Sequence, residues 1–132
     1  MATFPIANGV NYTCHPDHRN DNPNKSQWTI AEAAESQVFA SSYRSNWSQG
    51  RCYWGFHRPD GWVEYCGIAQ NRADRLFLAK FVDTNSTGLW HGYPADQRTE
   101  RPGCLMIRMW LDSAVLPAPK LRKILKGQPC SL

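Results

Sequence analysis

The sequence predicts an α+β fold, in which a four-stranded antiparallel β-meander has one helix before it and two helices after it. Residues 51–93 carry the strand-like alternation of apolar and polar side chains, and the links between these segments are too short for crossover helices. Apolar residues recur at helical spacing on both sides of that region. The length of 132 residues suits a single globular domain, with its core expected over residues 29–132.

The first 25 residues are rich in Asn, Pro and Asp and show no sustained period. We therefore expect residues 1–25 to form an extended arm or loop, with a short edge strand near residues 10–14. A capping box follows, in which the Thr29 hydroxyl and the Glu32 carboxylate satisfy N–H groups at a helix start. It predicts a helix over residues 30–42.

The clearest strand pattern lies in residues 51–69. Residues 51–57 and 62–69 each alternate between two faces, and the Arg-Pro-Asp-Gly sequence at 58–61 places proline and glycine where a turn needs them. This arrangement predicts a β-hairpin.

Two further strands complete the predicted meander. Residues 76–82 form the third, and residues 89–93 the fourth, with a polar turn at 84–88 between them. Pro94 has no backbone donor, so we expect it to end the fourth strand and to begin a loop.

The C-terminal quarter predicts two helices. Pro102 suits the first turn of a helix over residues 103–111, although residues 104–107 are also compatible with a strand. A last helix is predicted over residues 118–126, with Gly127 as its C-cap. Its apolar residues share one face, namely Leu121, Ile124 and Leu125.

Charge and composition limit the functional classes. The formal net charge is +4, and residues 98–132 hold 7 basic and 2 acidic groups, so the excess lies in that segment. We interpret it as the solvated face of a helix, and the alternative is contact with an anionic partner. Hydrophobic residues make up 42% of the chain and charged residues 20%, which excludes a disordered protein.

The chain carries no sign of export or membrane insertion. Its first residues lack the basic and apolar regions of a secretory signal, and no apolar run is long enough to span a bilayer. We therefore expect a cytoplasmic protein without a membrane partner. In a reducing compartment the five cysteines should be free thiols, mostly buried.

The predicted functional site lies at the end of the fourth strand, in residues 89–96. Alternation along a strand places His91 and Tyr93 on one face, and Asp96 follows in the loop. We predict His91 and Asp96 as catalytic residues, since imidazole and carboxylate suit acid–base work. The predicted ligand-binding residues are Trp90, Tyr93, Arg98, Arg101 and His57. The alternative is that the aromatics belong to the core or an edge and that His91 is a surface imidazole.

No metal or cofactor is predicted. Residues 14–18 (Cys-His-Pro-Asp-His) gather potential ligands, but zinc needs four, and no second pair follows at suitable spacing. His57 and Cys66 would complete such a site only if the fold brought them there. Phosphate-binding glycine loops, dinucleotide motifs and zinc-protease motifs are absent from the sequence.

Three functions remain open. The first is a module that binds a small molecule or a protein, because surplus aromatic residues often line pockets and interfaces. The second is a small hydrolase or nuclease that uses His91 as acid or base. The third is nucleic-acid binding through the basic C-terminal region. The sequence leaves the oligomeric state open, and a homodimer is compatible with it.

Three segments in the C-terminal third carry a resemblance. Residues 88–94 (Gly-Leu-Trp-His-Gly-Tyr-Pro), an Arg/Pro-rich loop, and residues 121–124 with 127–130 are similar to small uncharacterised bacterial proteins of the mobile gene pool, of the integron gene-cassette type. The resemblance covers the C-terminal third of the chain. It implies a soluble, stand-alone bacterial protein, and it implies no catalytic residues.

Overall fold

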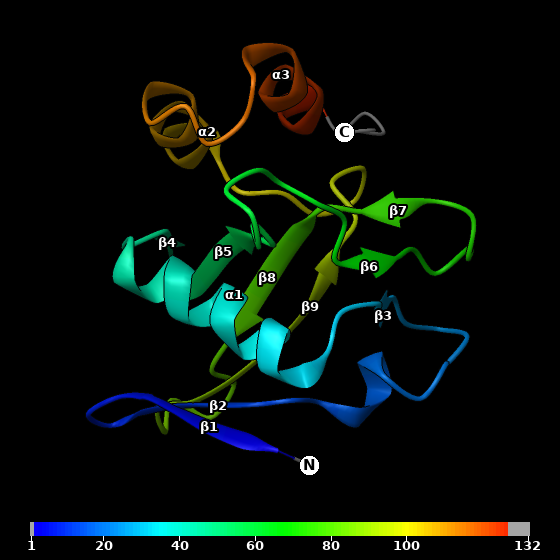
Figure 1. The fold of residues 1–132 in the computed structure, drawn as a ribbon, viewed down its shortest axis with the longest axis vertical. Coiled ribbons are helices and arrows are strands. Elements are labelled where there is room, and N and C mark those ends of the chain that lie inside the picture. The colour runs from blue at the N-terminus through cyan, green and yellow to red at the C-terminus, as the bar shows by residue number, and fades with distance from the viewer. Residues whose placement is uncertain (1, 127–132) are drawn as a thin grey trace.

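The computed structural model describes residues 2–126 and has the α+β architecture that the sequence predicts (Figure 1). Its strands form a mixed six-stranded sheet and a small antiparallel three-stranded sheet. The elements, in chain order, are β1 (Thr3–Ala7), β2 (Val10–Thr13), the 3-10 helix η1 (Pro16–His18), β3 (Gln27–Trp28), α1 (Glu32–Arg44), β4 (Ser48–Gln49), β5 (Cys52–Phe56), β6 (Gly67–Ile68), β7 (Arg75–Leu76), β8 (Leu78–Val82), β9 (Leu89–Ala95), α2 (Cys104–Asp112) and α3 (Ala118–Lys126).

The large sheet has the order β1-β2-β9-β8-β5-β4. Its neighbours are antiparallel except β2 and β9, which run parallel over two residue pairs. The small sheet has the order β3-β6-β7. The predicted four-stranded meander is therefore wrong in its details, although β5, β8 and β9 are antiparallel neighbours in the large sheet.

The predicted hairpin over residues 51–69 does not form. β5 pairs with β4 and β8, in the register Trp54 opposite Lys80, and the isolated bridge between His57 and Glu64 is the only β-pairing between residues 51–57 and 62–69 in the described chain. The burial of residues 62–69 does not follow the pattern of the predicted strand. A half-buried strand buries every second residue, whereas the buried Val63 and Cys66 lie three residues apart.

The fourth strand continues through Pro94 rather than ending before it, because Pro94 lies opposite Ala79 and the strand runs to Ala95. The Pro94 carbonyl accepts a hydrogen bond of 2.7 Å from the Ser26 hydroxyl, so it points away from β8. The N and C=O groups of one strand residue point to the same side. The missing N–H of Pro94 is therefore not needed in the ladder.

The N-terminal segment is part of the sheet rather than an extended arm. β1 and β2 form a hairpin, and the Tyr12 side chain on β2 is completely buried. The Tyr12 hydroxyl donates to the buried Glu35 carboxylate, which also pairs with Arg19 at 2.8 Å. These contacts fasten the segment to α1. The strand predicted near residues 10–14 is present as β2, but it lies inside the sheet with β1 at the edge, so residues 3–13 are not an extended arm.

Helix α1 begins two residues later than predicted, and the predicted capping box does not form. Ala31 is the N-cap and makes no side-chain capping bond. The Thr29 backbone N–H donates instead to the Cys66 carbonyl at 2.9 Å, beside the small sheet. Tertiary pairing with β6 thus determines where Thr29 lies, and the local capping preference does not.

The two C-terminal helices form close to their predicted bounds. α3 covers the predicted residues, and α2 begins at Cys104 with Gly103 as its N-cap, so Pro102 lies just outside the first turn. The strand alternative for residues 104–107 is wrong. Leu121 and Ile124 are buried as expected, whereas the predicted cap Gly127 lies outside the described residues.

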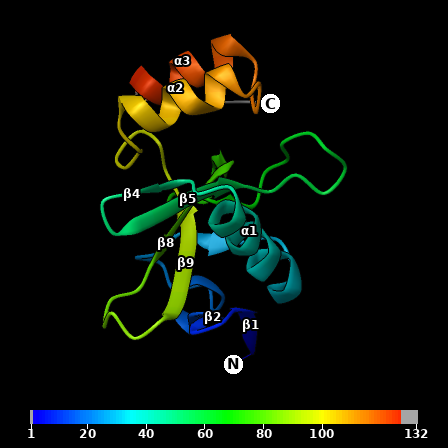
Figure 2. The ribbon, with the colours of Figure 1, turned by 90° about the vertical axis from the view of Figure 1, so that its left-hand side faces the viewer.

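Two hydrophobic clusters lie on opposite faces of the large sheet. Helix α1 covers one face, and the pair α2 and α3 packs over one end of the other (Figure 2). Phe39 and Phe81 lie in the first cluster, and Trp54, Phe56 and Trp110 lie in the second. The remaining part of the second face stays uncovered by helices (Figure 2).

The described part of the chain has no helix that is both long and apolar enough to cross a membrane. The four cysteines within it are free thiols. Cys14 and Cys66 are buried, Cys52 is half-buried and Cys104 is exposed, so the expectation of mostly buried thiols holds for half of these four.

Candidate functional site

The sheet face under α2 and α3 changes character along β9. Its register produces three cross-strand rows, each with one residue from β9, β8 and β5. From the covered end outward, the rows are Ala95–Leu78–Phe56, Tyr93–Lys80–Trp54 and His91–Val82–Cys52. The first row is buried in the second hydrophobic cluster, whereas His91, Tyr93 and Lys80 are only half-buried. Partly accessible polar side chains therefore lie on the part of this sheet face that α2 and α3 do not cover.

A row of three imidazoles flanks this face at the β9 edge. The ring centroids of His91 and His15 are 5.4 Å apart, and those of His15 and His18 are 6.1 Å apart. The His18 ring stacks on Tyr93, with a centroid distance of 5.1 Å and an interplanar angle of 16°. The chain leaving β2 carries His15 and His18 to this position. We call His15, His18 and His91 the histidine row.

His18 has a defined tautomer. Its Nδ1 lies 2.9 Å from the Ser26 carbonyl oxygen, which can only accept, so Nδ1 carries the proton. Burial lowers the pKa of His18, and the neighbouring His15 lowers it further, whereas the bond to Ser26 raises it. The ring is therefore neutral at pH 7, with an unprotonated Nε2 that is able to accept a proton.

Tyr93 and Lys80 share one carboxylate oxygen of Glu100. The Tyr93 hydroxyl lies 2.5 Å from Oε1, and the Lys80 ammonium lies 2.6 Å from the same atom. Burial and the Glu100 carboxylate together raise the pKa of Tyr93, so its hydroxyl stays protonated. The Lys80 ammonium also lies 5.3 Å from the centroid of the Trp54 ring. Each polar group thus has a fixed orientation.

A cavity of about 380 Å³ opens beside Tyr93 at the end of β9. We call it the β9 cavity, and its lining residues are His18, Asn24, Lys25, Ser26, Gln70, Leu76, Tyr93, Pro94, Asp96, Thr99 and Glu100. Its size falls within the range typical of small-molecule sites, and its polar groups come from segments far apart in the sequence.

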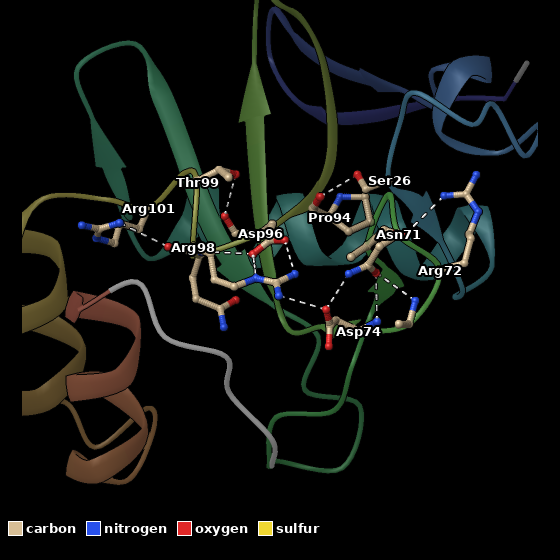
Figure 3. A network of polar contacts seen from close by, with 12 residues as sticks. Ser26, Asn71, Arg72, Asp74, Pro94, Asp96, Arg98, Thr99 and Arg101 are labelled. Carbon is tan, nitrogen blue, oxygen red and sulfur yellow. Dashed lines mark hydrogen bonds and ion pairs between the residues drawn. The ribbon is translucent and has the colours of Figure 1, made fainter.

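Arg98 joins the loop after β9 to the β6–β7 region (Figure 3). Its guanidinium binds both oxygens of Asp96, at 2.9 and 2.6 Å, and pairs with Asp74 at 2.9 Å. Asn71 donates to Asp74 at 2.8 Å and so extends the network. The hydrogen bonds from Arg98 lower the pKa of Asp96. Because two carboxylates hold this guanidinium, Arg98 orients Asp96 here rather than presenting a free cation.

The structure does not bring the two predicted catalytic residues together. His91 Nε2 lies 3.1 Å from the Thr84 hydroxyl, whereas Asp96 is held by Arg98. Five residues along an extended strand span about 16 Å, and an odd separation places side chains on opposite faces. Burial lowers the pKa of His91, and the neighbouring His15 lowers it further.

The predicted ligand-binding residues are divided among different places. Tyr93 lines the β9 cavity, whereas Trp90 lies on the opposite sheet face, stacked on Phe39 with centroids 5.5 Å apart. Arg101 donates to the Gln97 carbonyl at 3.3 Å. His57 lines a different cavity, next to α1.

Sequence reasoning did not assign His18, Lys80 or Glu100 to this site. The sequence marks His18 only as a potential metal ligand, and the neighbours of Lys80 depend on a register that only the fold reveals. Within residues 2–126, no group of three or more His, Cys, Asp or Glu side chains is arranged to hold a metal ion. The rings of the histidine row meet at tilted or edge-on angles, 43° between His15 and His91 and 66° between His15 and His18.

Comparison with known proteins gives this chain no relative. It matches no family model, and no curated protein or solved structure matches it significantly.

Proposed function

We propose that this protein binds a small polar molecule in the β9 cavity. The observation that carries the proposal is the convergence of His18, Tyr93 and Glu100 on one cavity of about 380 Å³, each with its orientation fixed by a hydrogen bond. Concave sites with a few convergent polar groups and shifted pKa values are the common form of ligand sites. The proposal retains the binding function expected from the sequence, but it places the site at His18 rather than at His91.

The internal pairing of charges favours an uncharged ligand. Glu100 is compensated by Lys80 and Asp96 by Arg98, and among residues 2–126 the exposed Lys25 is the one charged lining residue without an ion-pair partner. Neutral hydrogen-bonding groups supply much of the rim, namely Asn24, Ser26, Gln70 and Thr99. A ligand with several neutral donors and acceptors would bond to this rim without separating an existing ion pair, which would cost free energy.

The test compares neutral with anionic probes of the same shape. We expect nicotinamide or uracil at millimolar concentration to shift amide NMR signals near His18 and in residues 93–100. The anion nicotinate should shift them much less. His18→Phe should abolish the shifts, because phenyl keeps the stacking on Tyr93 but has no ring nitrogen. His57→Gln is the matched control and should leave them unchanged. Shifts that survive in His18→Phe would contradict the proposal.

A second candidate is hydrolysis with a histidine as acid or base, the alternative to binding in the sequence interpretation. The fixed Nδ1–H of His18 favours it, since such a ring has its other nitrogen free for proton transfer. The test measures release of 4-nitrophenol from 4-nitrophenyl acetate and from bis(4-nitrophenyl) phosphate. A rate that rises with pH below 6.5 and is lost in His18→Ala would support this role. Equal rates in wild type and His18→Ala would eliminate His18, and the same comparison with His91→Ala tests His91.

A further inference from the structure

A second cavity, of about 490 Å³, lies between α1 and the end of β5. We call it the α1 cavity, and its lining residues are Ala34, Gln37, Val38, Ala40, Ser41, Arg44, Phe56, His57, Arg58 and Pro59. Cationic, neutral polar and apolar side chains are present among them, but no carboxylate is. This composition differs from that of the β9 cavity, which has both Asp96 and Glu100 in its lining.

The base of the α1 cavity is apolar. Val38 of α1 is a buried lining residue, and Ala34 and Pro59 add apolar groups to the lining. Phe56 also belongs to the lining, but its side chain packs in the second hydrophobic cluster, on the opposite face of the sheet. Gly55 allows the close packing of α1 on β5, because a Cβ there would lie 3.3 Å from Ser42 Cβ and 3.4 Å from Val38 Cγ1. The cavity therefore offers an apolar surface as well as charge.

Two guanidinium groups at this cavity lack an ion-pair partner. Among residues 2–126, neither Arg44 nor Arg58 has a carboxylate oxygen within 4.0 Å, whereas Arg19, Arg72 and Arg98 each have one. Arg44 ends α1, where a cation also favours the helix dipole. Arg58 lies in a loop and has no such structural role. The unpaired charge at the cavity is thus not explained by helix stability alone.

His57 adds an imidazole to the same lining. The His57 side chain is half-buried. Burial lowers its pKa, whereas the charges of Glu64 and Asp60 raise it. Neither Glu64 nor Asp60 lines the cavity. The neutral ring can donate one hydrogen bond, and protonation would add a third positive charge.

We propose that the α1 cavity binds a small organic phosphate, with its dianionic group held by Arg44 and Arg58 and its apolar part against Val38 and Pro59. Two planar guanidinium forks suit the oxygens of a phosphate dianion, whereas one fork already suffices for a carboxylate. The Gln37 amide and the Ser41 hydroxyl supply further hydrogen bonds at the rim. This site is independent of the β9 cavity.

The experiment titrates the full-length protein with phenyl phosphate, which combines a dianion with one apolar ring, and follows binding by calorimetry. We expect dissociation in the millimolar range or tighter. Arg44→Gln and Arg58→Gln should each weaken binding at least ten-fold, since each removes a charge-assisted contact. Arg108→Gln removes an equal charge from the exposed face of α2 and should change the affinity less than two-fold.

Two further probes separate the charge from the apolar part. Inorganic phosphate should bind at least three-fold more weakly than phenyl phosphate, and phenol should show no binding at the same concentration. Equal losses in Arg58→Gln and Arg108→Gln would overturn the proposal, because attraction to the net charge would then be sufficient. No binding of phenyl phosphate at 10 mM would also overturn it. Thermal melting of each variant shows whether Arg44→Gln acts through helix stability, and Arg58→Gln is decisive if it does.

Discussion

The β9 cavity and the α1 cavity differ in how their charges are compensated. At the β9 cavity, Glu100 is paired with Lys80 and Asp96 with Arg98, and of its charged lining residues only the exposed Lys25 has no ion-pair partner within the described chain. At the α1 cavity, Arg44 and Arg58 have no carboxylate in ion-pair range within the described chain, and no acid contributes to the lining. Charges that are compensated within the fold orient their neighbours, whereas uncompensated ones attract a partner from solution. Measurements of stability and of binding should therefore separate the two.

The largest expected difference is between a half-buried arginine that pairs with a buried carboxylate and an exposed arginine that has no such partner. Arg19→Met leaves Glu35 completely buried with the Tyr12 hydroxyl and the Cys14 thiol as side-chain partners but without a compensating charge, and removing one member of such a pair costs about 3 kcal/mol of unfolding free energy. Arg58→Met should change stability by less than about 0.5 kcal/mol, as an ordinary surface substitution does. Urea unfolding of both variants checks this. Similar losses in the two would mean that Arg58 has a structural partner in solution.

The hydroxyl of Tyr93 should have the next largest effect on stability. Tyr93→Phe removes its bond to Glu100 but retains the ring that stacks on His18. We expect a loss of about 1.5 kcal/mol, the lower range for a hydrogen bond to a charged group, because Lys80 still compensates Glu100. Tyr65→Phe, at an exposed tyrosine, is the control for loss of a hydroxyl. If Tyr93→Phe melts at the same temperature as the wild type, the bond between Tyr93 and Glu100 does not contribute to stability.

Sequence reasoning succeeded where local periodicity decides the structure. Helix α3 forms over the predicted residues because its apolar side chains recur at helical spacing and Pro117 precedes it. It failed at residues 62–69, whose alternation resembles a strand but whose partners are β3 and β7. Which strand pairs with which depends on contacts far along the chain, and no local pattern encodes that choice.

The same reasoning explains what could be predicted of the candidate site. Alternation correctly placed His91 and Tyr93 on one face of β9. His18 reaches that face only because β2 lies parallel to β9, a pairing between segments more than 70 residues apart in the sequence. His57 was grouped with them by residue type, but the fold places it at the α1 cavity.

The Arg98–Asp96 pair should stabilise the loop after β9 modestly and in a pH-dependent way. Because Arg98 lowers the pKa of Asp96 in the folded chain, its contribution is complete above the ordinary carboxyl pKa, near 4. It is lost as the pH falls through the lowered folded value. We expect Arg98→Met to cost about 1 kcal/mol at pH 7, the upper range for a partly exposed pair. The difference from wild type should shrink between about pH 4 and pH 2 in urea titrations.

That pH dependence identifies the source of the loss. Arg108→Met, at an exposed position of α2, should show no comparable loss of stability at either pH. If Arg98→Met remains destabilised by the same amount at pH 2, the guanidinium stabilises the loop by packing and not through the carboxylates.

The smallest expected effect is a pH dependence at the α1 cavity, which sharpens the contrast with the compensated charges at β9. Burial keeps the pKa of His57 below its usual value near 6.5, so its ring is neutral at pH 7 in the free protein. A bound anion between Arg44 and Arg58 would raise that pKa, and by linkage the affinity must increase as the pH falls through it. The experiment measures the affinity for phenyl sulfate, because the charge of this probe does not change between pH 5.5 and pH 7.5.

We expect about three-fold tighter binding at pH 5.5 than at pH 7.5, equivalent to a rise of about half a unit in the pKa of His57 on binding. His57→Gln should bind equally at both values. Asp60 and Glu64 are the carboxylates whose charges act on the His57 ring. A pH dependence that persists in His57→Gln would assign the proton to another group and would remove His57 from the site.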